Sequence, residues 1–335
     1  MQVKLHYFHI IKRHILFFKK SGKKQKSMET YIGEVAGLAA AFCWTATAIA
    51  FESAGKKIGS LSVNLIRLFM AIFLLGIYTW ISRGLFLPVD ASFHQWKWLV
   101  ISGLVGFSLG DLFLFEAYVR IGARLSSLIM SFTPPIAGII GWFVMGERLT
   151  WLNIIGMVVT LTGIILVITQ RKNRNPNPSR IAENPPKKKR LSYQAVGIIL
   201  AFGGAAGQAT GLVLSKFGMQ DYDAFAATQI RVIAGTIGFT VLFFIMNRWR
   251  KVFTALKHKK AMKRVTAGAF FGPFLGVSMS LLAVQNTLTG IASTLMALVP
   301  VMIIPPAVFI FGEKVNALEI IGAFIAFGGV ALFFI

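Results

Sequence analysis

Two oppositely charged residues lie inside long apolar runs and are the first candidates for chemistry in this sequence. Arg67 falls within the run 61–81, and Asp111 within the run 96–117. An ionisable side chain is costly in hydrocarbon, so one inside a membrane span usually serves binding or proton transfer. Each lies about six positions from one end of its run, which at about 1.5 Å per residue gives a similar depth from the same membrane face. We therefore expect that Arg67 and Asp111 can pair.

This pair has two interpretations. In the first, Asp111 takes up and releases a proton and couples it to the movement of a solute, while Arg67 alternately neutralises Asp111 or holds a solute carboxylate. In the second, the two side chains form a static ion pair that ties two helices together. Glu52, near the end of the first apolar run, is a competing partner for Arg67. The sequence leaves these alternatives open.

Further polar and aromatic residues are predicted to line the same region from other helices. Arg231 is expected to bind an anionic group of a substrate, with Gln208 as its neighbour because both reach a similar depth. The alternative for Arg231, and equally for Arg67, is a long side chain that reaches back to the lipid head groups. Trp44, central in its run, is predicted to form an aromatic wall of the binding site or else to pack against helices or lipid.

Glu116 and two prolines complete the candidates. Glu116 lies four residues before Arg120, the spacing at which opposite charges meet on a helix. It is therefore predicted to form a structural ion pair or to assist Asp111 in coupling. Pro134 and Pro300 are predicted to break their helices, because carbonyls that lose their helical hydrogen bonds need partners that water or a substrate can supply.

Other kinds of site are not predicted. All five histidines fall in tails or loops, so we expect no metal site and no cofactor. A single cysteine, Cys43, excludes a disulfide within the chain. The pairs Gly110-Asp111 and Tyr222-Asp223 superficially resemble the paired aspartates of intramembrane proteases. Their order along the chain is reversed and the glycine motif is incomplete, so we expect no enzyme and no catalytic residue.

The elements that must position these residues are ten apolar runs. Hydrophobic residues make up 56% of the chain and charged residues 14%, and the mean hydropathy is +0.69, which is typical of a membrane protein. About 20 apolar residues suffice to cross a hydrocarbon core of roughly 30 Å. We therefore predict an all-α integral membrane protein with ten transmembrane helices at 32–54, 61–81, 96–117, 126–144, 152–169, 193–214, 225–246, 265–283, 288–311 and 318–335.

The ten runs form two repeats. Residues 125–166 recur at 291–332, and fainter matches at spacings of 160 to 166 extend the duplication to the earlier runs. An odd number of spans per repeat makes the second copy enter the membrane from the opposite side, so we predict two inverted five-helix repeats. The pairs that match at a spacing of 166 include Pro134 and Pro300, Gly146-Glu147 and Gly312-Glu313, Gly156 and Gly322, and Gly163 and Gly329.

This repeated pattern resembles the EamA-type branch of the drug/metabolite transporter superfamily. A proline is followed twelve residues later by Gly-Glu, and the next run opens with Ile-Gly and carries a glycine near its end, twice over. The resemblance implies a first repeat at 32–170 and a second at 193–335, in a multi-pass protein of the cell membrane. It also implies efflux of small metabolites, amino acids or drugs.

Basic residues outside the runs concentrate in three clusters, at 4–26, 171–190 and 248–264, with eight Lys or Arg in each. Such clusters in membrane proteins face the cytoplasm and contact anionic lipid head groups, so we expect lipid partners and no nucleic acid. The second and third clusters share one side, opposite the N-terminal one. Charge counting therefore places both termini outside, whereas the resemblance implies cytoplasmic termini.

Two segments lie outside the repeats. The basic tail, 1–31, is too short and interrupted to span a membrane, and is predicted to be an interfacial amphipathic helix, or else to be untranslated if synthesis starts at Met28. The linker, 171–192, carries four prolines among basic and polar residues and is predicted to be a flexible hinge.

These features predict a secondary transporter, and more specifically an exporter, that moves a small metabolite, amino acid or drug by alternating access, with proton coupling as a hypothesis. A lipid flippase or a passive channel on the same scaffold is the alternative, and a membrane-embedded enzyme is less favoured. We expect a monomer or a homodimer with a small-molecule substrate.

Overall fold

The computed structural model describes residues 31–170, 187–309 and 315–335, which form helices and no strand. Residues 1–30 of the predicted tail, most of the linker and the Gly312-Glu313 pair lie outside the described residues. Helix α8 already includes 187–192. Two elements, η1 (Leu104–Gly110) and η3 (Phe270–Gly276), are π-helices. The remaining helices are α2 (Ile32–Ile58), α3 (Ser60–Arg83), α4 (Phe93–Gly103), α5 (Asp111–Met130), α6 (Thr133–Met145), α7 (Trp151–Gln170), α8 (Lys187–Met219), α9 (Ala224–Ile245), α10 (Trp249–Leu256), α11 (Lys259–Ala269), α12 (Val277–Asn286), α13 (Thr289–Met296), α14 (Val299–Met302), α15 (Ile304–Phe309), α16 (Ala317–Ala331) and the short η4 (Leu332–Phe334).

Nine helical stretches in the described part of the chain are long and apolar enough to cross a membrane. They coincide with nine of the ten predicted runs. The run predicted at 126–144 is divided in the structure, because α5 continues to Met130 and α6 starts anew at Thr133. With 13 residues, α6 is shorter than the roughly 20 residues that a straight crossing requires.

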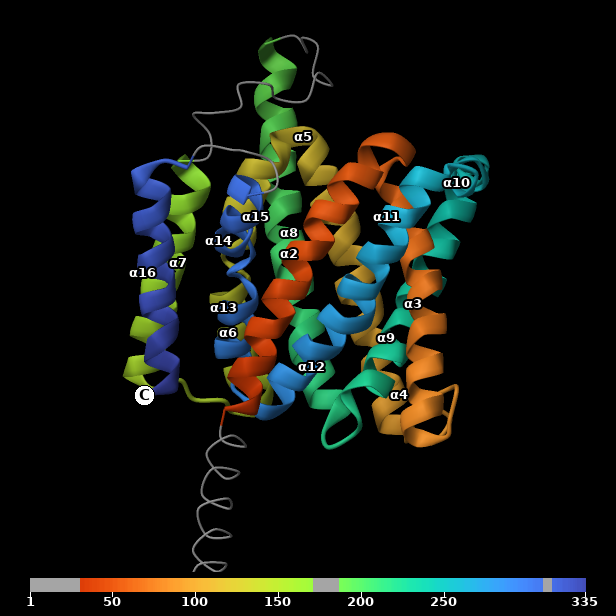
Figure 1. Cartoon of the computed structure of the whole chain (residues 1–335), viewed down its shortest axis with the longest axis horizontal. Helices are drawn as coiled ribbons and strands as arrows, with labels where there is room; N and C mark the ends of the chain where they lie inside the picture. The colour runs from red at the N-terminus through yellow and green to blue at the C-terminus, as the bar shows by residue number, and fades with distance from the viewer. Residues whose placement is uncertain (1–30, 171–186, 310–314) are drawn as a thin grey trace, which may run out of the picture.

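The long helices stand alongside one another as a bundle, with α7 and α16 at one edge and α10 at the opposite edge (Figure 1). The start of α2 and the C-terminal end of the chain lie at one face of this bundle, which we call the terminal face. The start of α8 and the α10–α11 hairpin lie at the other face, which we call the basic face. The third basic cluster, 248–264, thus lies at the face opposite the start of α2, whereas the first cluster and most of the second lie outside the described residues.

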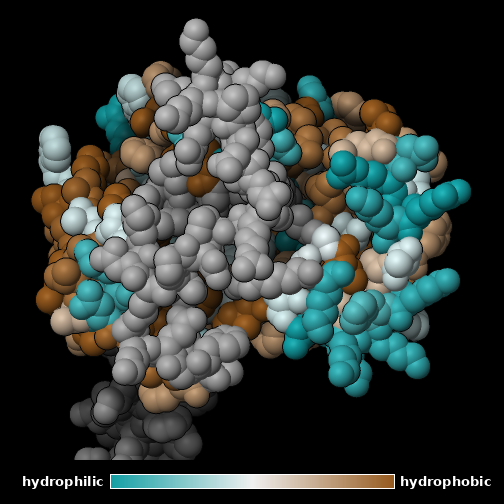
Figure 2. All heavy atoms as spheres, turned by 90° about the horizontal axis from the view of Figure 1, so that it is seen from above, coloured by the Kyte–Doolittle hydropathy of each residue, from teal (hydrophilic) through white to brown (hydrophobic). Residues whose placement is uncertain are grey.

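The basic face gathers hydrophilic side chains over α10 and α11, beside apolar side chains of the bundle (Figure 2). The third basic cluster, 248–264, supplies this region. A cavity of about 310 Å³ lies here, between the end of α2 and α10. Its lining includes Lys57, Arg250, Lys251 and His258 and no carboxylate.

Duplicated glycines let α7 and α16 pack at very close range. A Cβ atom added at Gly163 would lie 2.5 Å from the carbonyl oxygen of Gly322, and one added at Gly156 would lie 3.0 Å from that of Gly329. The later glycine of α7 thus faces the earlier glycine of α16, so the two helices run antiparallel. Small residues at such an interface are a common means of close helix contact in membranes.

The two π-helices occupy equivalent places, 166 residues apart, and each receives a different long helix. Helix α8 packs on η1, where a Cβ atom added at Gly211 would lie 2.9 Å from the Cα atom of Gly106. Helix α2 packs on η3, where a Cβ atom added at Gly272 would lie 2.9 Å from the Thr47 methyl carbon. A π-turn often marks a functional site, so its duplication at this point singles out the residues that follow it.

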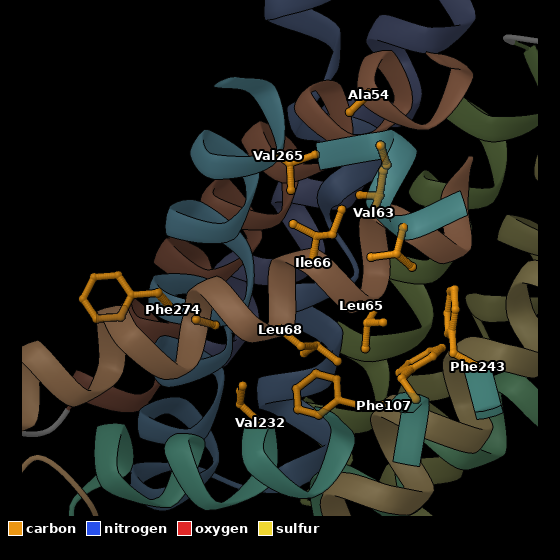
Figure 3. Packing of buried hydrophobic residues seen from close by; sticks show 14 of the residues in the cluster. Ala54, Val63, Leu65, Ile66, Leu68, Phe107, Val232, Phe243, Val265 and Phe274 are labelled. Atoms are coloured by element: carbon orange, nitrogen blue, oxygen red, sulfur yellow. The ribbon is translucent and has the colours of Figure 1, made fainter. Parts of the chain in front are cut away.

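An apolar cluster fills the space between α3 and α9. Leu68 of α3, Val232 of α9 and Phe107 of η1 belong to it and lie near one another (Figure 3). Arg67 directly precedes Leu68, and Arg231 directly precedes Val232. Both arginines therefore emerge from helices whose neighbouring positions are packed in an apolar core.

Candidate functional site

Arg67, Asp111 and Gln208 meet in one buried polar network. A terminal nitrogen of Arg67 donates to Oδ2 of Asp111 at 2.7 Å, and the side-chain amide of Gln208 donates to Oδ1 at 2.8 Å. Arg67 and Asp111 are each only 7% exposed. The expected pairing of Arg67 with Asp111 is present, whereas Gln208, expected beside Arg231, is bound to Asp111 instead. The side chain of Glu52 lies outside the described residues.

Helices from both repeats assemble this network. Arg67 lies on α3, Asp111 is the first residue of α5 directly after η1, and Gln208 lies on α8. A Cβ atom added at Gly207 would lie 3.0 Å from the Cα atom of Gly110, so the backbones of α8 and η1 touch at this point. This close approach brings the short side chain of Asp111 within reach of a residue of the second repeat.

Arg231 lies beside this network without joining it. Its guanidinium carbon lies 5.0 Å from the centre of the Phe107 ring, and the residue is 5% exposed. Its Nε atom is buried and has no hydrogen-bond partner in the described part of the chain. The Nε atom of Arg67 is likewise unpartnered there, although its terminal nitrogen binds Asp111. The arrangement places two guanidinium groups and one carboxylate in the same buried region.

Trp44 lies against the second π-helix rather than in the network. Its indole Nε1 donates to the Ser280 hydroxyl at 3.3 Å. A Cβ atom added at Gly276 would lie 3.5 Å from the Trp44 ring. The structure thus brings Trp44 to η3 and α12, while the polar network is built around η1 and α8.

Glu116 is also separate from the network. Its carboxylate pairs with a terminal nitrogen of Arg120 at 2.9 Å, and the Glu116 side chain is 47% exposed. Such an exposed pair at this helical spacing contributes at most about 1 kcal/mol. Glu116 thus pairs with Arg120 as their spacing predicts, and among the described side chains its carboxylate is not bonded to Asp111.

Pro134 and Pro300 stand at the beginnings of new helices, directly after breaks. In the first repeat α5 ends at Met130, and Pro134 lies in the first turn of α6. In the second, α13 ends at Met296, and Pro300 lies in the first turn of α14. The two breaks are at equivalent positions of the repeats. Each occurs just before a proline, because proline has no N–H to continue the preceding helix but fits the first turn of a new one.

A second polar cluster joins the two repeats at the terminal face. Glu147 pairs with Lys216 at 2.7 Å and accepts hydrogen bonds from the backbone N–H and the hydroxyl of Thr289. Lys216 also donates to the Thr287 carbonyl, and the Thr287 hydroxyl donates to Glu34. Glu147 thereby caps α13, a helix of the other repeat, and this contact between the repeats was not predicted from the sequence. The feature of the sequence that could have indicated this cluster is Lys216, a lysine close to the end of the apolar run 193–214.

A third polar cluster closes loops at the same face. The Tyr222 hydroxyl donates to Asp90 at 2.9 Å and accepts from Arg83, which also pairs with Asp90. Burial, with the neighbouring Asp90 carboxylate, raises the pKa of Tyr222 to about 12 against the opposing effect of Arg83. Asp223 accepts from the backbone N–H of Ala226 and so caps α9.

No group of three or more His, Cys, Asp or Glu side chains in the described ranges is arranged to hold a metal ion. The chemistry that the polar network supports is charge pairing and proton exchange at one carboxylate. A buried carboxylate between a guanidinium and an amide can be neutralised by a proton, and its partners are then released.

Comparisons with known proteins agree with these features. The model of the EamA-like transporter family matches residues 31–169 and 195–335. An uncharacterized transporter of Clostridium kluyveri is 22% identical over 238 residues, which is 70% of each chain. An uncharacterized membrane protein of Saccharomyces cerevisiae is 24% identical over 149 residues, covering 43% of this chain and 36% of that one. A solved crystal structure superposes with a TM-score of 0.68 at 16% identity, over 90% of this chain and 94% of that chain, and so shares the fold.

Proposed function

Because this chain belongs to the EamA-like transporter family, a membership that indicates a multi-pass membrane transporter rather than an enzyme, we propose that it is a proton-coupled secondary transporter. It moves a small metabolite, amino acid or drug by alternating access, in the outward direction and across the cell membrane. The observation that carries the proposal is the buried contact of Asp111 with Arg67 and Gln208.

The proposed scaffold for alternating access is a pair of inverted five-helix repeats, an arrangement found in many secondary transporters. Three features support it: the antiparallel packing of the equivalent helices α7 and α16, the π-helices at equivalent positions, and the helix breaks before Pro134 and Pro300. In this proposal α6 completes a tenth span together with the end of α5.

Protonation of Asp111 is the proposed coupling step. As a carboxylate, Asp111 holds α3 of the first repeat and α8 of the second in one network. A proton neutralises it, weakens the ion pair with Arg67 and lets the two repeats move relative to each other. Deprotonation on the other side of the membrane restores the pair and resets the transporter.

The Glu147 cluster fits the same cycle as a closure of the terminal face. It ties the end of α6 to α8 and α13 through charged hydrogen bonds, each of which is stronger than a neutral one. For a solute to leave at that face, the contact between Glu147 and Lys216 must open. The cationic cavity near α10 suits the phosphates of anionic lipids, which would anchor the basic face.

The experiment has two stages. A metabolite-wide comparison of cells lacking and overproducing the protein identifies compounds whose export changes. Flux of those compounds is then measured in proteoliposomes with and without a pH gradient. We expect a pH gradient to drive accumulation of the compound in the wild type. Asp111→Asn keeps the shape of the side chain but cannot take up or release a proton, so it should abolish pH-driven accumulation while leaving the protein folded.

Asp90→Asn is the matched control, because it alters a carboxylate outside the buried network. Full pH-driven flux in Asp111→Asn would remove this residue from the coupling step. Flux in the wild type that only equalises concentrations, whatever the pH gradient, would indicate a passive channel instead.

A further inference from the structure

We infer that the substrate is a monocarboxylate and that its carboxylate binds Arg231. This rests on the proposed function, since it assigns the substrate class of the same buried centre. Arg67 and Arg231 are both buried there, and only Asp111 balances them among the described side chains. A buried charge without a counter-charge is destabilising, so a second negative group is expected in the centre during transport.

The repeats show where that negative group belongs. Arg67 and Arg231 are equivalent residues, 164 positions apart, on the helices α3 and α9, which contact each other. The first repeat supplies a carboxylate at Asp111, directly after its π-helix. The equivalent residue of the second repeat is Val277, which is 2% exposed and packed in the apolar cluster. One arginine has an internal carboxylate, and a ligand supplies the carboxylate that the other lacks.

The surroundings of Arg231 suit a carboxylate attached to an apolar body. The guanidinium lies over the Phe107 ring, and its Nε atom retains an unused hydrogen. No side chain covers it at Gly106, where a Cβ atom would lie 3.3 Å from a terminal nitrogen of Arg231. A planar guanidinium binds a carboxylate through two parallel hydrogen bonds, and an aromatic ring offers apolar contact next to them.

The charge balance separates a monocarboxylate from other ligand classes. Among the described side chains the centre has one unbalanced positive charge, whereas a phosphate monoester carries about 1.5–2 negative charges at neutral pH. A simple amine lacks a free counter-charge, because both oxygens of Asp111 already accept hydrogen bonds from Arg67 and Gln208. Amino acids remain within the class through their carboxylate.

The test is ligand-induced thermal stabilisation of the full chain in lipid nanodiscs, without any ion gradient. The probes are matched pairs of acid and primary amide: benzoate and benzamide, phenylalanine and phenylalaninamide, lactate and lactamide. Glycerol phosphate and benzylamine serve as the phosphate and amine arms. We expect at least one acid, and not its amide, to stabilise the wild type saturably.

Arg231→Gln is expected to weaken that binding by about tenfold or more, because it removes charge-assisted hydrogen bonds. Arg231→Lys, which keeps the charge but not the planar fork, is expected to weaken it less. Arg83→Gln is the control, since Arg83 pairs with Asp90 at the terminal face. If Arg231→Gln does not fold, the affinity of Arg231→Lys and the comparison of acids with amides in the wild type decide whether a carboxylate binds Arg231.

The inference is overturned if amides bind as well as acids, if only the phosphate or the amine binds, if none of the probes stabilises the wild type, or if Arg231→Gln retains full affinity. These outcomes leave the coupling proposal standing, because binding is measured without a gradient. Conversely, acid binding that is intact in a protein whose flux ignores pH overturns only the coupling step.

Discussion

The two π-helices are equivalent in position, yet one leads into a charged network and the other into an apolar core. Asp111 follows η1 and contacts Arg67 and Gln208. Val277 follows η3 and lies in the apolar cluster, and Ala48 of α2 stands where α8 has Gln208. The duplicated glycines and helix breaks give the two halves the same backbone arrangement. The side chains that carry charge are free to differ, so the halves share a scaffold but not a chemistry.

Asp111→Val would give the first half the residue of the second, and we expect the largest effect. Arg67 would remain buried without its carboxylate, and removing one partner of a buried pair costs about 3–5 kcal/mol. The measurement is the free energy of unfolding in mixed micelles or nanodiscs. The double variant Arg67→Leu/Asp111→Val should recover much of that loss, because it removes the stranded charge. A single variant as stable as the wild type would show that the pair is not needed for stability.

Val277→Asp would give the second half the residue of the first. We expect the new carboxylate to be tolerated only in the presence of Arg231, with a coupling free energy of about 1–3 kcal/mol in a double-mutant cycle with Arg231→Gln. Val277→Asn is the neutral control. The variant should also lose acid binding, because an internal carboxylate then occupies Arg231. Additive effects of the two substitutions would show that positions 231 and 277 do not communicate.

Gly207→Thr would give α8 the residue that α2 has at the equivalent position, Thr47. The added side chain would meet the Cα atom of Gly110, and such overpacking costs about 1–3 kcal/mol. By separating α8 from η1 it should also weaken the contact of Gln208 with Asp111 and reduce pH-driven flux. Gly328→Thr, where a side chain would meet open space, is the control. Unchanged stability would mean that α8 can shift without loss.

Trp44→Phe addresses the other half and should have the smallest effect. It removes the hydrogen bond to Ser280 but keeps an aromatic ring, so we expect a loss of about 0.5–1.5 kcal/mol. Ser280→Ala should cost a similar amount, and the two losses should not add. Acid affinity should be unchanged, because Trp44 contacts η3 rather than the network. A marked loss of affinity would instead restore Trp44 as a substrate contact.

The sequence predicted the class of fold well because hydrocarbon imposes a simple requirement on length and composition. In the described part of the chain, nine of the predicted apolar runs form long helices. A match over both repeats confirmed the family resemblance. The division of the run at 126–144 was missed, since hydropathy alone does not show that α5 continues to Met130. The π-helices were missed as well, because the glycines that mark them also serve ordinary helix contact.

The candidate site was predicted in part. Depth along two helices sufficed to pair Arg67 with Asp111, because both lie in one repeat and near the same face. Depth did not predict the partner of Gln208, because several helices carry polar side chains at the same depth in the membrane. Only the lateral arrangement of the helices decides which of these side chains are in contact. The same reason explains why Glu147, Lys216 and Thr289, far apart in sequence, were not recognised as one cluster.

Composition and repetition by themselves determined that this chain is a duplicated helical membrane protein with a few buried charges. They did so because the cost of exposing polar groups to hydrocarbon acts on every residue locally. Only the tertiary structure decided that Asp111 is satisfied by both repeats while Arg231 keeps an unpaired nitrogen. That outcome depends on which helices pack in close backbone contact at their glycines. Such contacts are a property of the packed bundle and not of any single segment.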